Sequence, residues 1–209
     1  MPKYIAEFVG TFFLVLAVIC AVNKDDIAVV APIAIGATLM AMIYSVGNIS
    51  KAHFNPVVTL SFFALGKCSS KDVIGYIIAQ LSASVLATAI AMYVYDCHPD
   101  TAPVNMDLVK GGVAEILGTF ALVWVIIFVA ISKSNAGNSF FGLAIGMMVI
   151  GGAYILGDQG SMGCFNPAVA LATYINGLNT GWNLIPITAA NLIGAGIATG
   201  VYRQYFKNV

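Results

Sequence analysis

The 209-residue sequence contains little charge: only 9% of its residues are Asp, Glu, Lys or Arg, and the nine basic and nine acidic residues cancel. A soluble domain has about 25% charged residues. With 60% hydrophobic residues and a mean hydropathy of +0.92, the composition is instead typical of a membrane protein. The net charge of zero gives no sign of nucleic-acid binding, so no nucleic-acid partner is expected.

The sequence also lacks the patterns of a metal site, a disulfide framework or an enzyme. It has four cysteines, at Cys20, Cys68, Cys97 and Cys164. Their spacing matches no metal or redox motif, so we expect no disulfide framework. His53 has no second His or Cys at ligand spacing, and the "DCHPD" segment at 96–100 is predicted to be a solvated turn with weak metal potential. Without a nucleophile–base pair or phosphate loop, no catalytic residue, metal or cofactor is predicted.

Long apolar runs dominate what is present. They lie near 4–22, 31–47, 73–95, 112–131, 139–157 and 182–202. A helix that crosses about 30 Å of hydrocarbon needs about 20 residues, so the runs predict an all-α membrane protein with six transmembrane helices. With both termini cytoplasmic, only Lys24 and Lys110 among the nine basic residues lie outside, as the positive-inside rule favours. We therefore expect a multi-pass integral membrane protein with that orientation, in the cell membrane.

Two segments occur twice in the chain. "AEFVGTF" at 6–12 returns as "AEILGTF" at 114–120, and the Asn-Pro pair of "HFNPVVTL" returns in "CFNPAVAL". Each copy holds three predicted spans, an odd number, so the copies must be inverted relative to each other in the bilayer. The repeats cover about 4–95 and about 112–205 of a single transmembrane domain at 1–209.

Each Asn-Pro pair precedes an apolar run of about ten residues, at 55–65 or 166–175, which as a helix reaches about half of the hydrocarbon. Asn is a preferred N-cap and Pro is favoured at the first helical position, so both pairs predict helix starts. Inverted copies place two re-entrant half-helices end to end near the midplane, where irregular backbone must line a cavity. We expect the amide NH₂ groups of Asn55 and Asn166 to point freely into this pore and interrupt proton conduction.

The six spans, the repeat, "SVGNISKAHFNPVVTL" and "GCFNPAVAL" together resemble the aquaporin or major intrinsic protein family along essentially the whole chain. The resemblance implies a homotetramer in a lipid bilayer with a pore for water and small neutral solutes in each subunit. It also assigns the pore motifs. These are Asn55, Pro56, Val57, Asn166, Pro167 and Ala168.

The resemblance also implies roles for four residues near the pore. Glu7 and Glu115 are carboxyl groups inside spans, which a coupled transporter would use as a proton relay; the family implies instead that they accept hydrogen bonds from the re-entrant loops. His53 is expected to line the cytoplasmic vestibule and steady its loop. Cys164 either lines the outer vestibule or is a small buried hydrophobe.

The outer selectivity filter departs from the family pattern. Aquaporins usually have an arginine after the second Asn-Pro-Ala, where this chain has Val169, and its only arginine is Arg203. Counting positions as in the family places Ile35, Tyr154 and Gly163 beside Val169. This filter would lack a fixed cation.

Several functions remain open on this basis. The "NPAVA" wording resembles one group of plant vacuolar intrinsic proteins, which implies passage of ammonia, urea or hydrogen peroxide besides water. A glycerol facilitator is the alternative, although such proteins carry Asp where this chain has Ala170. A proton-coupled transporter and a non-conducting structural protein are the other candidates.

Overall fold

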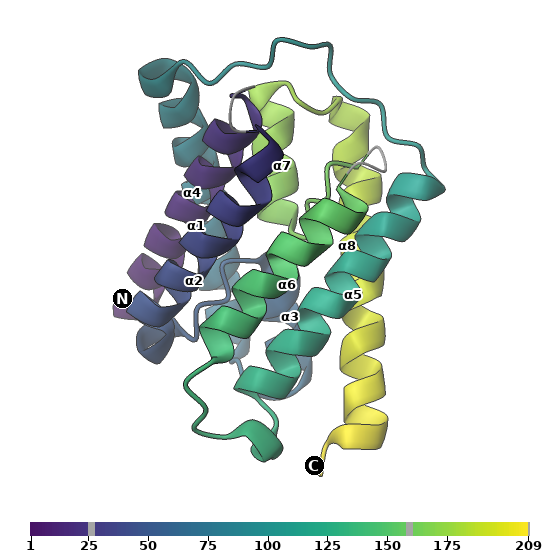
Figure 1. The fold of residues 1–209 in the computed structure, drawn as a ribbon. Coiled ribbons are helices and arrows are strands. Elements are labelled where there is room, and N and C mark those ends of the chain that lie inside the picture. Colours follow the sequence, from purple (N-terminus) through teal and green to yellow (C-terminus); the bar gives the residue numbers. More distant parts are fainter. Residues whose placement is uncertain (25–27, 158–160, 209) are drawn as a thin grey trace.

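The computed structural model describes residues 1–24, 28–157 and 161–208, and its regular elements are helices (Figure 1). The long helices are α1 (Pro2–Val22), α2 (Ala31–Ser50), α4 (Ser70–Tyr95), α5 (Lys110–Ala130), α6 (Phe141–Leu156) and α8 (Leu184–Val201). The short helices are α3 (Pro56–Ala64) and α7 (Pro167–Asn176). Three 3₁₀ turns at Ala28–Val30, Lys133–Asn135 and Gly181–Asn183 and a π-helical turn at Tyr202–Phe206 complete the described helices. Helices occupy the positions of all six predicted spans and of both half-helices, with ends shifted by at most three residues.

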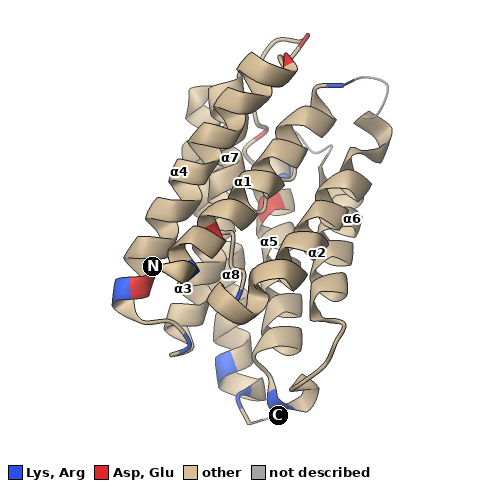
Figure 2. Ribbon diagram, turned by 90° about the vertical axis from the view of Figure 1, so that its left-hand side faces the viewer, with Lys and Arg blue, Asp and Glu red and all other residues tan. Residues whose placement is uncertain are grey.

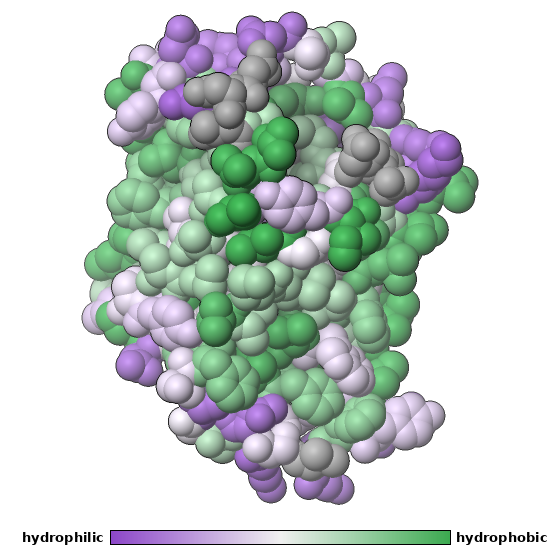
Figure 3. Space-filling view, viewed as in Figure 1, coloured by the Kyte–Doolittle hydropathy of each residue, from purple (hydrophilic) through white to green (hydrophobic). Residues whose placement is uncertain are grey.

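The helices have the length and surface of membrane spans. Among the described residues, five helices are long and apolar enough to cross a bilayer, while α6 has only 16 residues, about 24 Å of helix. On the face shown in Figure 3, apolar side chains form a broad band across the middle of the molecule and polar ones gather at both ends. Lys and Arg follow the same division, lying at the ends of the bundle (Figure 2). The chain is therefore an integral, multi-pass membrane protein.

The three long helices of each repeat pack against one another in the same way. Helix α1 packs against α2 and α4, α5 packs against α6 and α8, and the α2–α6 contact joins the two halves. In Figure 1, α3 occupies the lower half of the bundle and α7 the upper half. The half-helices thus enter from opposite ends, as an inverted repeat requires.

Helices α2 and α6 approach closely at two glycines that are equivalent in the two repeats. A Cβ atom on Gly36 would lie 2.7 Å from the carbonyl oxygen of Gly146, and a Cβ atom on Gly146 would lie 2.7 Å from that of Gly36. Small residues let helix backbones come together in membranes, where dispersion contacts drive association. This contact fixes the spacing of the two halves around the central space.

Candidate functional site

The two half-helices begin as the Asn-Pro pairs predict. The Oδ1 atom of Asn55 accepts the N–H of Val57 at 3.0 Å, and that of Asn166 accepts the N–H of Ala168 at 2.9 Å. Each Asn has extended backbone and is followed by proline at the first helical position. The caps leave the N-terminal ends of α3 and α7, the positive ends of their helix dipoles, facing each other at the centre of the bundle.

The sequence predicted that the amide NH₂ groups of the two asparagines point into the pore without a protein partner. In the structure, each NH₂ group makes one hydrogen bond within the protein. The Nδ2 atom of Asn55 donates to the carbonyl of Phe165 at 2.9 Å, and that of Asn166 donates to the carbonyl of Phe54 at 2.9 Å. The prediction missed these bonds because it treated each half-helix alone, whereas the carbonyl before one asparagine is within reach of the other. Since an amide NH₂ has two donors, one N–H of each asparagine remains for a molecule in the pore.

Each loop before a half-helix is held by a buried glutamate. Glu7 accepts the N–H groups of His53 and Phe54 at 2.9 and 2.8 Å. Glu115 accepts those of Cys164 and Phe165 at 2.7 and 2.8 Å. Both carboxyl side chains are fully buried. The hydrogen bonds expected from the family resemblance are thus present in both halves.

Sequence reasoning missed the third donor to each glutamate. Gln80 donates to Glu7 at 2.8 Å, and Asn191 donates to Glu115 at 2.7 Å. The two amides occupy equivalent positions on α4 and α8. An amide side chain at matching positions in the third span of each repeat was the sequence feature that could have identified these donors. Three donors satisfy each carboxylate where burial would otherwise be costly.

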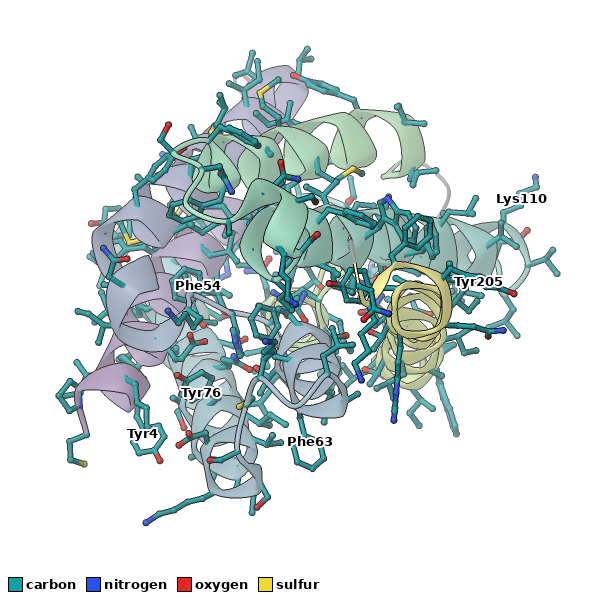
Figure 4. The ribbon with its side chains drawn as sticks, turned by 90° about the horizontal axis from the view of Figure 1, so that it is seen from below. Tyr4, Phe54, Phe63, Tyr76, Lys110 and Tyr205 are labelled. Atoms are coloured by element: carbon teal, nitrogen blue, oxygen red, sulfur yellow. The ribbon has the colours of Figure 1, made fainter. Side chains whose placement is uncertain are left out.

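The glutamates hold the loops in a strained conformation. Phe54 and Phe165 have φ of 48° and 49°, in the left-handed region that non-glycine residues rarely adopt. Their rings occupy the space beside Gly10 of α1 and Gly118 of α5, where a Cβ atom would overlap the ring. Seen from below, Phe54 lies within the bundle, whereas Phe63 and Lys110 point away from it (Figure 4). The hydrogen bonds and ring packing together offset the backbone strain.

A cavity of about 520 Å³ passes the point where the half-helices meet. Its lining extends from Val22 and Val104 near one end of the bundle to Ala130 and Phe141 near the other. Asn55 and Asn166 both line it, while the prolines and the residues after them lie outside the lining. Pro56, Val57, Pro167 and Ala168 therefore support the asparagines from behind, buried in the protein.

The cavity wall is mostly apolar. Its described polar side chains are few. They are Lys51, His53, Asn55, Asn166 and Thr173, with the Cys164 thiol beside them. Lys51 is the only cationic side chain among the described lining residues, and Arg203 is exposed on the terminal π-helical turn, outside the lining. No described arginine thus takes the place left by Val169.

Three of the four predicted filter residues, Ile35, Gly163 and Val169, line the cavity. The fourth, Tyr154, does not: its side chain is exposed and its hydroxyl donates to the carbonyl of Val29 at 2.8 Å. Ala153 lines the cavity in its place. Adjacent helical residues point about 100° apart, so the side chain one position before Tyr154 faces the cavity while that of Tyr154 does not.

Tyr154 has a structural counterpart in the first repeat. Tyr44 of α2 accepts the N–H of Leu143 at 2.9 Å and donates to the carbonyl of Ser139 at 3.3 Å. The two tyrosines occupy equivalent positions in the repeats, and each binds backbone at the start of the partner helix. Tyr154 thus links α6 to the segment before α2.

His53 and Cys164, the equivalent vestibule residues, both line the cavity while being largely buried. The Nδ1 atom of His53 lies 3.1 Å from Thr59 Oγ1, and its ring packs 4.2 Å from that of Phe62. Among the described residues, its Nε2 atom has no hydrogen-bond partner. Cys164 is 6% exposed, with its Sγ 3.6 Å from the carbonyl of Ser161. Cys164 is therefore buried and also part of the cavity wall, so both descriptions considered from the sequence apply to it.

The fold and the cavity define a multi-pass membrane protein with a cavity at the centre of its helix bundle. A family model described as "Major intrinsic protein" matches residues 1–205, and the chain belongs to this family. It is 31% identical to Aquaporin AqpM of Methanothermobacter thermautotrophicus, over 99% of this chain and 97% of that protein. It is 36% identical to Aquaporin NIP1-1 of Arabidopsis thaliana over 72% of this chain, which spans only 56% of the plant protein.

The fold is also similar to a solved structure. The X-ray structure of the aquaglyceroporin from Plasmodium falciparum superposes with a TM-score of 0.83, covering 98% of this chain and 96% of that one at 18% sequence identity. This likeness shows the shared fold.

Proposed function

We propose that the chain is a passive channel for water and small neutral solutes that excludes ions. The observation that carries this proposal is the reciprocal pair of hydrogen bonds by which Asn55 and Asn166 join the two half-helix starts at the cavity wall. Each asparagine keeps one donor for a passing oxygen, and two helix dipoles repel cations at the same point. A water held there accepts from both asparagines, which breaks a proton-conducting chain.

The apolar filter extends the proposal to solutes other than water. Ile35, Ala153, Gly163 and Val169 supply little hydrogen-bonding capacity and no charge, which supports passage of ammonia, urea and hydrogen peroxide besides water. The alanine at 153 widens the filter relative to the predicted tyrosine. That observation favours a glycerol facilitator as the second candidate, because a polyol needs room and an apolar wall for its carbons.

The carboxyl groups do not support a proton-coupled transporter. Glu7 and Glu115 are each held by two backbone N–H groups and a side-chain amide, and neither lines the cavity. A proton relay needs a carboxyl group that exchanges protons with water in the transport path. Their role in the proposal is to hold the loops.

The proposed setting is a homotetramer in the cell membrane, with both termini in the cytoplasm. The excess of Lys and Arg on the side of the termini supports this orientation. Each subunit contains its own cavity, so transport does not require a pore between subunits.

Stopped-flow light scattering on proteoliposomes tests the proposal. Water, ammonia, urea and glycerol are compared on one preparation, with and without ionophores that collapse proton and sodium gradients. The channel follows each solute gradient and is unaffected by the ionophores. Uptake that stops when an ion gradient collapses contradicts a passive channel, and glycerol passing faster than urea selects the second candidate.

A further inference from the structure

Two cysteines that lie far apart in the sequence meet at one end of the bundle. Cys20 is in the last turn of α1, Cys97 follows the end of α4, and their Sγ atoms are 3.2 Å apart although 77 positions separate the residues. A disulfide has an S–S distance of about 2.05 Å, so the sulfur atoms need to approach by only about 1 Å. Sequence spacing gave no hint of this pair.

The backbone that carries the two thiols is already fixed. The carbonyl of Cys97 accepts a hydrogen bond from Asn176 of α7 at 2.9 Å, and Asn176 accepts one from Asn23 at 2.9 Å. Asn23 also donates to the carbonyl of Ile19, next to Cys20, at 2.8 Å. The ends of α1, α4 and α7 therefore hold the two sulfur atoms close together. Because the backbone is already ordered, forming the disulfide costs little conformational entropy.

The two thiols differ in access. Cys97 is 1% exposed, whereas Cys20 is partly exposed and borders a hollow next to Lys24 and Tyr95. A small reagent thus reaches Cys20 first, and Cys97 reacts through it. The other cysteines have no thiol partner within the described structure: Cys68 Sγ lies 3.7 Å from the carbonyl of Ser69, and Cys164 lines the cavity.

We propose that Cys20 and Cys97 form an intramolecular disulfide on the extracytoplasmic side. The Cys20 thiol loses its proton and attacks a small-molecule disulfide, forming a mixed disulfide, and the leaving sulfur takes up the proton and departs as one thiol. The Cys97 thiol likewise loses its proton and attacks the Cys20 sulfur, and the second small-molecule thiol departs with a proton. Two cysteine thiols are thus oxidised and one disulfide is reduced to two thiols. The compartment follows from the proposed orientation, since an extracytoplasmic location is oxidising. The bond itself does not depend on the proposed transport function.

The disulfide clamps the outer ends of α1 and α4 without entering the pore. Neither cysteine lines the cavity, so the bond leaves water permeability unchanged. It restricts the unfolded chain by closing the loop between positions 20 and 97, which raises thermal stability.

The test uses the full-length protein in detergent, equilibrated with oxidised glutathione and then denatured and alkylated with a maleimide polymer that shifts it on a gel. Two of the four thiols are expected to be protected, with a Cys20–Cys97 peptide found by mass spectrometry and both thiols recovered after reduction. The Cys20→Ser and Cys97→Ser variants lose this protection, whereas Cys68→Ser and Cys164→Ser retain it. Oxidation raises the melting temperature of the wild type, but not of Cys20→Ser, by several degrees.

Four reactive thiols per chain after oxidation overturn the proposal, as does a disulfide that maps to Cys68 or Cys164. Oxidised and reduced protein are also compared in proteoliposomes. A change in water permeability of more than about twofold overturns the assignment of the bond as a clamp outside the pore.

Discussion

Two asparagine side chains do three things each in this structure. Each caps its own half-helix, donates to the loop of the other half and keeps one N–H towards the cavity. An asparagine is suited to this combination because it offers both an acceptor and two donors on one rigid amide. The carboxylate of an aspartate can accept the capping hydrogen bond, but it has no N–H to donate to the other loop or to a molecule in the cavity.

Asn166→Asp is therefore expected to lose function more than stability. Its carboxylate still caps α7 but faces the carbonyl of Phe54 without a proton to donate. We expect about 1–3 kcal/mol of destabilisation and, if the proposed channel is correct, a cation leak at the position of Asn166. Thermal melting and a pH-dye assay in proteoliposomes measure the two effects. Asn208→Asp, at an exposed position, is the control, and an equal leak in both variants contradicts the placement of Asn166 at the pore.

The filter assignment leads to a second prediction at this scale. Because Ala153 lines the cavity and Tyr154 does not, Ala153→Phe is expected to reduce urea and glycerol passage about fivefold or more relative to water. Tyr154→Phe removes only the hydrogen bond to Val29 and should leave the solute ratios unchanged. Solute and water permeabilities of both variants are measured at equal protein density. If Tyr154→Phe changes the solute ratios and Ala153→Phe does not, Tyr154 rather than Ala153 belongs to the filter.

At the scale of elements, aromatic rings and glycines hold each half-helix in place. The Phe165 ring lies where a side chain at Gly118 of α5 would be, and the Phe54 ring stands in the same relation to Gly10 of α1. Gly118→Ala is expected to cost about 1–3 kcal/mol by overpacking. Gly151→Ala in α6, where a Cβ atom meets nothing within 4 Å, is the control and should be neutral or stabilising. Thermal unfolding in detergent compares them, and equal melting temperatures refute the packing argument.

The helices could be predicted closely from the sequence because apolar run length sets a membrane span and Asn-Pro sets a helix start. Contacts between elements were harder to predict. The Asn166 amide meets the carbonyl of Phe54 only once both half-helices are in place, and the position of Tyr154 depended on helix phase. The donors Gln80 and Asn191 were detectable as equivalent buried amides, whereas nothing in the sequence pairs Cys20 with Cys97.

At the scale of the whole molecule, duplication explains why the cavity passes through the centre. Each repeat supplies one half-helix, one glutamate and one strained loop, and inversion brings the two sets together from opposite ends. Neither repeat alone can complete the site, because each asparagine donates to the other repeat. The α2–α6 contact at Gly36 and Gly146 keeps this spacing.

The most direct test of the central claim is the osmotic water permeability of proteoliposomes that contain the folded protein, measured by stopped-flow light scattering against protein-free liposomes. The account predicts permeability about tenfold or more above bare lipid, with no proton leak and no effect of ionophores. It also predicts that permeability falls when Asn55 and Asn166 are both changed to Asp in a variant that still folds. Wild-type permeability equal to that of bare lipid, with folding confirmed, would contradict the account.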